Sequence, residues 1–271
     1  MTAISATLVK ELREMTGAGI MDAKRALQDT GGDVDAAKKL LREKGMANAD
    51  KRAGRVTTEG KVGYRIHEDG SRATIVGIGC ETEPVSKNDE FQAFGHRVLQ
   101  AVHADGPGAV EGLEQERLEL VGKLGENIVV AGAARFEGES GDALAGYAHP
   151  PANKIGVLVH LRGGSEELAR QLAMHIAFAA PEWAARTDVP AEVVETERGI
   201  YLNSDEVQSK PGPAREKIVD GMLGKRFYAA TPGGVLADQA WVHDASMTVA
   251  QALEEAGASV VAFERVSVAG A

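Results

Sequence analysis

Residues 72–102 read RATIVGIGCETEPVSKNDEFQAFGHRVLQAV and predict a strand, an exposed turn and a helix in succession. The first nine residues are rich in β-branched side chains, which favours a sheet strand over a helix. Pro84 fixes its own φ, lacks an N–H and biases Glu83 away from helical backbone, so the chain is expected to leave the strand before a helix begins. Ser86 or Asn88 can then cap a helix with an apolar stripe at helical spacing. That stripe consists of Phe91, Phe94, Val98 and Val102.

Residues 82–85 (TEPV) are therefore expected to form a short loop with regular structure at both ends. Such a loop can present a preset shape to a partner without a large ordering cost. The ordinary alternative is a solvated connection between strand and helix, and these four residues alone do not separate the two interpretations.

The composition is typical of a globular protein, with 44% hydrophobic and 26% charged residues among 271. A formal net charge of −10 argues against broad binding to a phosphate backbone, so no direct nucleic-acid partner is expected. Cys80 is the only cysteine, which excludes an intrachain disulfide and suits a reducing cytosol. The N-terminus lacks an apolar signal segment, and no apolar run reaches about 18 residues. A cytoplasmic protein without a membrane span is expected.

Residues 1–50 are predicted to form a three-helix docking module. Ser5 and Asp33 can cap the first and third helices, and Gly45 is expected to end the third. Helices this short have to stabilise one another by packing. Residues 51–60 are polar and are expected to be a linker, with helix as an alternative for part of it. The side chains expected to face inward are Leu8, Leu12, Met15, Ile20, Ala23, Leu27, Val34, Ala37, Leu40 and Leu41.

The remainder is predicted to be an α+β core of two related lobes with an inserted antiparallel helical hairpin. A weak repeat supports the two lobes, because a Gly-Tyr pair occurs at residues 63–64 and again at 146–147. The hairpin is expected to reverse at residues 210–213 (KPGP). The predicted units are lobe N at 61–140, lobe C at 141–189, the hairpin at 190–229 and a return to lobe C at 230–271.

No sequence motif indicates catalysis, a cofactor or a metal. Residues 221–226 have the wrong spacing for a P-loop, and residues 77–82 lack the third glycine of a dinucleotide loop. The seven histidines show no recognised metal spacing, and Cys80 has no local activating motif. These gaps favour a binding protein over an enzyme, although a hydrolase that uses Asp, Glu or His is left open.

Motifs along nearly the whole chain are similar to those of the bacterial elongation factor Ts family. Residues 80–85 (CETEPV) and 88–92 (NDEFQ) stand where that family has its Thr-Asp-Phe-Val loop and the following helix. The other matching motifs are 8–13 (LVKELR), 16–24 (TGAGIMDAK), 32–33 (GD), 125–128 (GENI), 155–159 (IGVLV), 174–177 (MHIA) and 191–194 (AEVV).

The resemblance implies a guanine nucleotide exchange factor that binds elongation factor Tu, in its GDP-bound and nucleotide-free forms, during translation elongation. It also implies a ubiquitin-associated-like N-terminal module and a hairpin used for association, as a homodimer or a 2:2 complex. In the family the loop helps to displace magnesium, after which the GDP phosphates lose much of their neutralisation. No bond is made or broken by such a factor, so neither a catalytic residue nor a cofactor is expected.

The resemblance also implies which residues contact the partner. Thr82, Glu83, Pro84 and Val85 correspond to the intruding loop. The further contacts are Lys24 in the N-terminal module, Leu124, Gly125 and His149 in the core, and Val242 and His243 near the C-terminus. Ordinary structural roles stay open for these, such as a core position for Val242, a loop position for His149 and a solvated position for Lys24.

Two loop positions depart from the family pattern. Glu83 replaces an aspartate and keeps its charge, whereas Pro84 replaces a phenylalanine, a residue type that can bury about 150–250 Å². The loop is therefore expected to intrude through its backbone shape and Val85, with a weaker wedge. The chain ends at Ala271, soon after the last predicted strand, so an extended C-terminal contact module is expected to be missing or reduced.

A second interpretation belongs to another functional class. It is a ubiquitin-associated-like adaptor of the translation machinery that binds its partner without accelerating GDP release.

Overall fold

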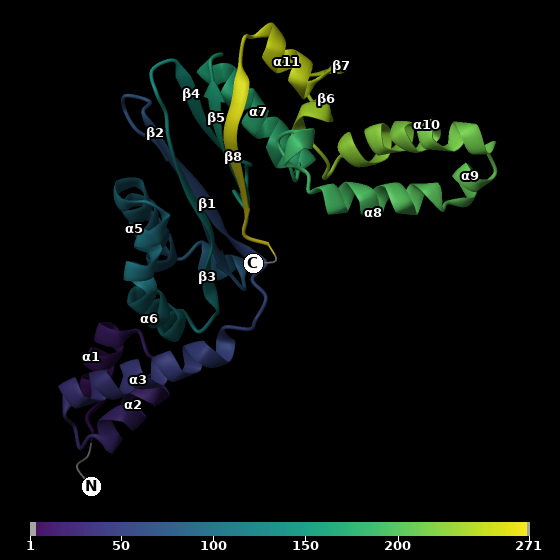
Figure 1. Cartoon of the computed structure of the whole chain (residues 1–271). Coiled ribbons are helices and arrows are strands. Elements are labelled where there is room, and N and C mark those ends of the chain that lie inside the picture. Colours follow the sequence, from purple (N-terminus) through teal and green to yellow (C-terminus); the bar gives the residue numbers. More distant parts are fainter. Residues whose placement is uncertain (1–3, 270–271) are drawn as a thin grey trace.

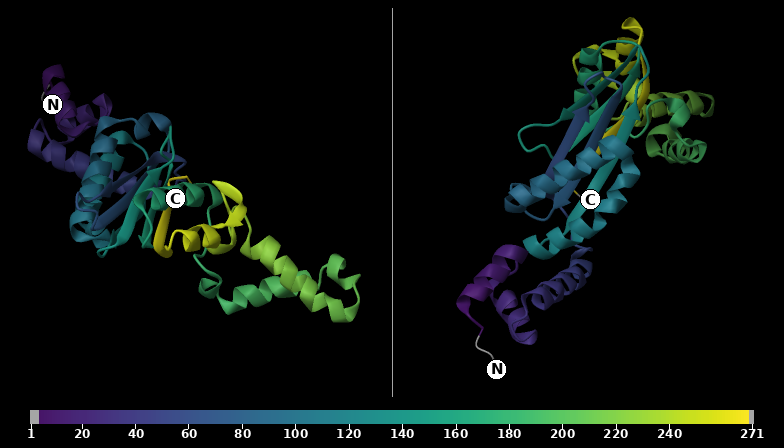
Figure 2. Two further views of the ribbon diagram at one scale, coloured as in Figure 1. Left: turned by 90° about the horizontal axis from the view of Figure 1, so that it is seen from above. Right: turned by 90° about the vertical axis from the view of Figure 1, so that its left-hand side faces the viewer.

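The computed structural model describes residues 4–269 and arranges them in three parts along an elongated molecule (Figure 1). Three helices form the N-terminal end, two β-sheets with covering helices form the middle, and a helical hairpin projects from the second sheet. Figure 2 shows the N-terminal helices and the hairpin standing clear of the sheets on opposite sides. The coarse expectation of a mixed α and β fold is confirmed.

The N-terminal helices are α1 (Ala6–Thr16), α2 (Ile20–Asp29) and α3 (Val34–Arg52). The Ser5 hydroxyl accepts a hydrogen bond from Leu8 N at 3.1 Å, and the Asp33 carboxylate accepts one from Ala36 N at 3.0 Å. Both predicted caps are therefore present. The helices pack around a small apolar core of Val9, Leu12, Ala23, Ala26, Leu27 and Ala37.

Three expectations for this part are wrong. Gly45 does not end a helix, because α3 continues to Arg52. Instead, Gly45 faces Gly122 of α6 (Glu114–Leu124), where an added Cβ at Gly122 would lie 3.1 Å from the Cα of Gly45. Met15 and Ile20 do not face inward; they are 50% and 57% exposed, because they flank the turn that separates α1 from α2.

The first sheet consists of β1 (Glu59–Ile66), β2 (Arg72–Cys80) and β3 (Ile128–Glu137), in the antiparallel order β1-β2-β3. Helix α5 (Asp89–Asp105) covers one face and buries the predicted stripe that begins with Phe91 and Phe94. The connection to β3 runs through the 3-10 helix η1 (Pro107–Leu113) and α6. The predicted strand and helix at residues 72–102 are confirmed.

The second sheet consists of β4 (Asp142–Ala148), β5 (Ile155–Arg162) and β8 (Ser259–Ser267), in the antiparallel order β4-β5-β8. Helix α7 (Glu166–Ala179) packs on it through Leu172 and Ile176. The last strand of the chain thus completes this sheet.

The two sheets lie face to face around Val62, Ile75, Leu158 and Val266. Glycines permit this close approach, because a Cβ at Gly77 would lie 2.4 Å from Val266 Cγ1. Interiors packed this tightly have no room for an added methyl group unless the backbone moves.

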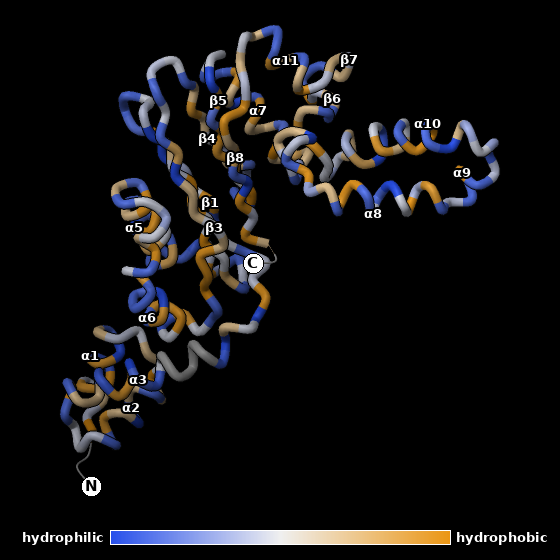
Figure 3. Tube along the Cα trace, viewed as in Figure 1, coloured by the Kyte–Doolittle hydropathy of each residue, from blue (hydrophilic) through white to orange (hydrophobic). Residues whose placement is uncertain are grey.

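The hairpin comprises α8 (Ala191–Leu202), α9 (Asp205–Gln208), α10 (Gly212–Met222) and the π-helix η3 (Leu223–Tyr228). Its own apolar cluster includes Val207, Val219 and Met222. Figure 3 shows hydrophobic and hydrophilic residues alternating along α8 and α10, as expected for amphipathic helices that pack on each other.

Short elements join the hairpin to the last strand. They are η2 (Arg186–Asp188) before it, and η4 (Leu236–Asp238), β6 (Ala240–Trp241), β7 (Asp244–Thr248) and α11 (Val249–Glu255) after it. The β6–β7 pair was not anticipated from the sequence, because these strands are short and β7 is mostly exposed. Over residues 4–269, no helix combines the length and apolar character that crossing a bilayer requires.

Candidate partner-binding site

The predicted loop at residues 82–85 is largely one helical turn, α4 (Glu83–Ser86), and this corrects the expectation. Thr82 before it is extended, with φ −128° and ψ 153°. Pro84 stands in the first turn of this helix, where a missing N–H breaks no intrahelical hydrogen bond. Glu83 is helical in the structure, although a following proline disfavours helical backbone at that position.

Glu126, in the connection between α6 and β3, anchors the start of this turn. Its carboxylate accepts hydrogen bonds from the backbone nitrogens of Glu81 (3.1 Å) and Thr82 (3.0 Å), and a third from the Thr82 hydroxyl. In return, Glu81 Oε1 accepts a hydrogen bond from Asn127 N at 2.6 Å. The structure thus brings the turn together with the segment that contains the predicted contact residue Gly125.

The turn presents a polar edge and keeps an apolar base. Thr82, Glu83 and Pro84 are exposed, whereas Val85 is half-buried against the core beneath α5. Lys87 Nζ lies 2.7 Å from Glu83 Oε1, and its hydrogen bond lowers the pKa of the Glu83 carboxyl. Glu83 therefore carries its negative charge near neutral pH, at the tip of a preordered turn.

Cys80 supports the turn from below and offers no reactive thiol. Its sulfur donates a hydrogen bond to Thr82 O at 3.3 Å, and the side chain is fully buried. Burial raises the pKa of the Cys80 thiol to about 12. Because the thiolate is the nucleophilic form, the expectation of a structural thiol agrees with this environment.

His149 lies at the same end of the two sheets, in the exposed turn between β4 and β5. Its Nδ1 is 2.8 Å from the Tyr147 hydroxyl. The same turn is bound to β1, because Val62 N donates to Asn153 O at 2.7 Å. Since α4 packs beside β1, the turn that holds His149 belongs to the same surface region as α4.

The remaining predicted contacts lie on other surfaces. Lys24 is exposed on α2, beside Met21, which is 65% exposed and was not singled out from the sequence. The sequence feature that could have indicated Met21 is its place in the first turn of α2, next to Ile20 and close to the glycine turn that precedes the helix. Val242 and His243 form the turn between β6 and β7, near α7, and Val242 is 48% exposed rather than a core residue.

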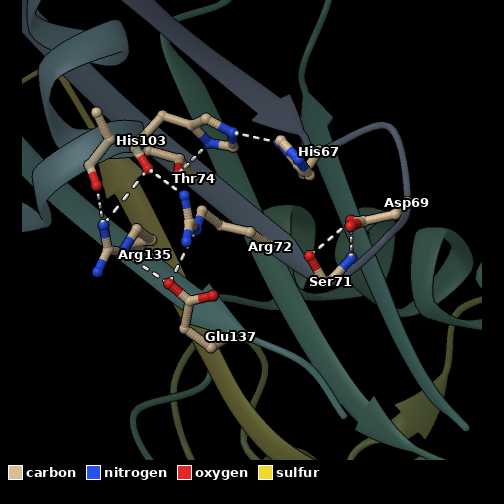
Figure 4. A network of polar contacts seen from close by, with 9 residues as sticks. His67, Asp69, Ser71, Arg72, Thr74, His103, Arg135 and Glu137 are labelled. Carbon is tan, nitrogen blue, oxygen red and sulfur yellow. Dashed lines mark hydrogen bonds and ion pairs between the residues drawn. The ribbon is translucent and has the colours of Figure 1, made fainter. Parts of the chain in front are cut away.

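A polar network around His103 caps the end of α5 (Figure 4). Arg72 Nη1 donates to His103 O at 3.2 Å, and Arg135 Nη1 donates to Ala104 O at 2.9 Å, so two guanidinium groups meet the last carbonyls of α5. Glu137 binds both arginines. Within the described part of the chain, no cluster of three His, Cys, Asp or Glu side chains is arranged to hold a metal ion.

Known proteins resemble this chain over nearly its whole length. The family model described as "Elongation factor TS" matches residues 81–270. An "Elongation factor Ts" from Alkalilimnicola ehrlichii is 42% identical, over 98% of this chain and 92% of the relative. Proteins of the same name from Idiomarina loihiensis and Pseudomonas fluorescens are 44% and 39% identical, over 98% and 99% of this chain and 91% of each relative.

Proposed function

Because this chain belongs to the elongation factor Ts family, we propose that it is a guanine nucleotide exchange factor that binds elongation factor Tu and promotes release of GDP. Membership of the family establishes a role in translation elongation. The proposal adds the partner, the exchanged nucleotide and the cytoplasm as the compartment. It involves no bond chemistry by the factor itself.

The preordered turn at residues 82–85 is the observation that carries this proposal. Three hydrogen bonds to Glu126 fix its start, and the Asn88 side chain caps the helix that follows it. A rigid turn loses little conformational entropy when it enters a partner. Its ionised Glu83 can compete with phosphate oxygens for a magnesium ion and repel the phosphates themselves.

The mechanism is one of linked binding. A factor that binds the nucleotide-free partner more tightly than the GDP form must weaken GDP binding by the same ratio. Shifting a population from 1:99 to 99:1 requires a differential affinity of about 5.5 kcal/mol, which one small turn does not supply. The proposal therefore includes Lys24, Leu124, Gly125, His149, Val242 and His243 as further contacts, spread over the N-terminal helices and the core.

The N-terminal helices are proposed as a docking module that resembles ubiquitin-associated domains. Their exposed apolar side chains Met15, Ile20 and Met21 gather around the α1–α2 turn, close in sequence to Lys24. Apolar side chains rimmed by a charge are typical of a contact surface. The projecting hairpin is proposed to serve association, as a homodimer or a 2:2 complex with elongation factor Tu.

Stopped-flow release of labelled GDP from elongation factor Tu tests the exchange activity. We expect release to accelerate with increasing concentration of this protein and to reach a plateau. Binding without any acceleration would instead identify an adaptor and overturn the proposal.

Substitution of Pro84 tests the role of the turn. Pro84→Phe adds an aromatic wedge and is expected to raise the plateau rate several-fold, about the value of one well-packed aromatic contact. Pro84→Ala is expected to lower it or leave it unchanged. Pro213→Ala is the matched control, because Pro213 also stands in the first turn of an exposed helix but lies on the hairpin. A slower rate with Pro84→Phe would contradict the wedge account.

A further inference from the structure

A buried polar chain joins the turn between β6 and β7 to the hairpin root, which is the pair of segments 179–182 and 230–234 that lead into and out of the hairpin. His175 of α7 is 1% exposed, and Gln239 is fully buried. His175 Nδ1 lies 3.3 Å from the backbone nitrogen of Val242, and Nε2 lies 2.9 Å from Gln239 Oε1. Buried polar groups persist where their hydrogen bonds are made, and these bonds connect segments that are distant in sequence.

The partners of the imidazole determine its protonation state. A backbone N–H can only donate, so His175 Nδ1 must accept from Val242. The amide nitrogen of Gln239 faces the carbonyl oxygens of Ala230 and Gly233, which leaves its oxygen for the Nε2–H of His175. A protonated ring would place two N–H groups against each other at Val242. Burial also lowers the pKa of His175, in agreement with a neutral ring.

Helix α7 holds the turn at a second point. His243 Nε2 lies 3.1 Å from the carbonyl oxygen of Gln171, one helical turn before His175. The Trp241 ring stacks on His175 at a centroid distance of 5.3 Å and contacts His243 at 4.8 Å. The two residues at the turn are therefore each fastened to α7, while the Val242 side chain stays exposed.

Gln239 is also hydrogen-bonded to both chain segments of the hairpin root, at Ala179 and at Ala230 and Gly233. Its amide nitrogen lies 3.4 Å from the carbonyl oxygen of Ala179, the last residue of α7 before the chain runs towards the hairpin. Gly233 N donates to the same carbonyl at 3.0 Å, and Glu182 N donates to Gly234 O at 2.9 Å. A displacement of this root would move Gln239 and, through it, the imidazole and the turn.

We propose that His175 and Gln239 are positioning residues that hold the turn of Val242 and His243 in a fixed relation to the hairpin root. The positioning role stands by itself. Its effect on elongation factor Tu rests on the proposed function, in which Val242 and His243 contact that protein.

Two amide substitutions at position 175 separate the two hydrogen bonds of the ring. In His175→Asn the short amide replaces Nδ1 and can still accept from Val242 N–H. In His175→Gln the longer amide replaces Nε2 and can still donate to Gln239, so Val242 N–H loses its acceptor. Loss of such a buried hydrogen bond is expected to change the equilibrium constants that depend on it by about tenfold.

The measurements are amide exchange at Val242 and the affinity for elongation factor Tu. For His175→Gln we expect about tenfold faster exchange at Val242 and about tenfold weaker binding. His175→Asn is expected to keep the exchange rate at Val242 close to the wild type, whereas its affinity should fall in part because the bond to Gln239 is lost. The nitrogen-15 spectrum of the wild-type ring should report a protonated Nε2 and a bare Nδ1 at neutral pH, and this result needs no variant to fold.

Each contrary result has a distinct meaning. Equal protection of Val242 in the two variants, or a ring protonated at Nδ1, overturns the positioning role. If amide protection at Val242 changes but the affinity for elongation factor Tu does not, the proposed effect on partner binding is overturned. If the wild type fails to bind elongation factor Tu while Val242 behaves as expected, the proposed function fails and the positioning role survives.

Discussion

His103 illustrates how single buried residues join elements in this protein. Its Nδ1 lies 2.9 Å from the Thr74 hydroxyl and its Nε2 lies 3.3 Å from His67 Nδ1. Burial lowers the pKa of His103, and the charges of Arg65, Arg72, His67 and Arg135 lower it further. The ring is thus held neutral among cations, at the end of a helix that supports the candidate site (Figure 4).

This environment predicts a pH dependence of stability. The lowered pKa means that the unfolded chain takes up a proton at about pH 6.5 while folded His103 stays neutral. The unfolded state then binds more protons, so the free energy of unfolding falls as pH drops below about 6.5. Urea denaturation as a function of pH measures the slope.

His103→Gln removes the titrating group and keeps a hydrogen-bonding side chain. We expect a shallower slope below about pH 6.5 in this variant. His175 also has a lowered pKa and is left intact, so part of the slope should persist. An identical slope in the variant and the wild type would show that His103 does not contribute.

At the scale of elements, the residue that caps α5 also lies next to the candidate turn at residues 82–85. Asn88 Oδ1 accepts hydrogen bonds from Glu90 N at 2.9 Å and Phe91 N at 3.3 Å. Asn88 N donates to Val85 O at 3.0 Å, so the residue that caps α5 is also hydrogen-bonded to the last turn of α4. The exposed turn is therefore continuous with a capped, buried helix.

Loss of this cap should be measurable. Asn88→Ala is expected to lower the free energy of unfolding by about 1 kcal/mol, because two backbone N–H groups lose their acceptor. Asn88→Asp keeps the acceptor and should remain close to the wild type. Denaturant unfolding compares the three proteins. An equal loss in both variants would indicate that the side-chain oxygen is not the stabilising group.

At the scale of the whole molecule, α6 fastens the N-terminal helices to the sheets. Gly45 and Gly122 allow α3 and α6 to cross closely, and Arg42 binds Glu119 at 2.9 Å beside the crossing. The side chain of Lys123 lies over Gly17, where a Cβ would come within 2.1 Å. The position of Lys24 relative to the candidate turn therefore depends on this junction.

A bulky residue at the crossing should release the N-terminal helices. Gly122→Val is expected to cost about 1–3 kcal/mol through overpacking against the α3 backbone. X-ray scattering should then report a larger radius of gyration, and binding of elongation factor Tu should weaken. Gly221→Val is the matched control, because Gly221 also lies in a helix and has open space around its Cβ position. Unchanged scattering and stability in Gly122→Val would refute the role of the crossing.

Local sequence signals were sufficient for much of this fold. The apolar stripe of α5, the caps at Ser5 and Asp33 and the β-branched run of β2 all follow from interactions within a few residues. Family resemblance, rather than composition, supplied the candidate contact residues. Local signals gave wrong predictions at Gly45 and Pro84, where contacts with residues distant in the chain decide the backbone conformation.

By itself, the sequence determined most of the longer helices and strands, because backbone preference and hydrophobic periodicity act over short distances. Only the tertiary structure decided that Gly45 serves a helix crossing, that Pro84 lies in a helical turn anchored by Glu126, and that His175 connects the hairpin root to Val242. Each depends on a partner distant in the chain, and contacts with such partners outweigh local preferences of about 1 kcal/mol.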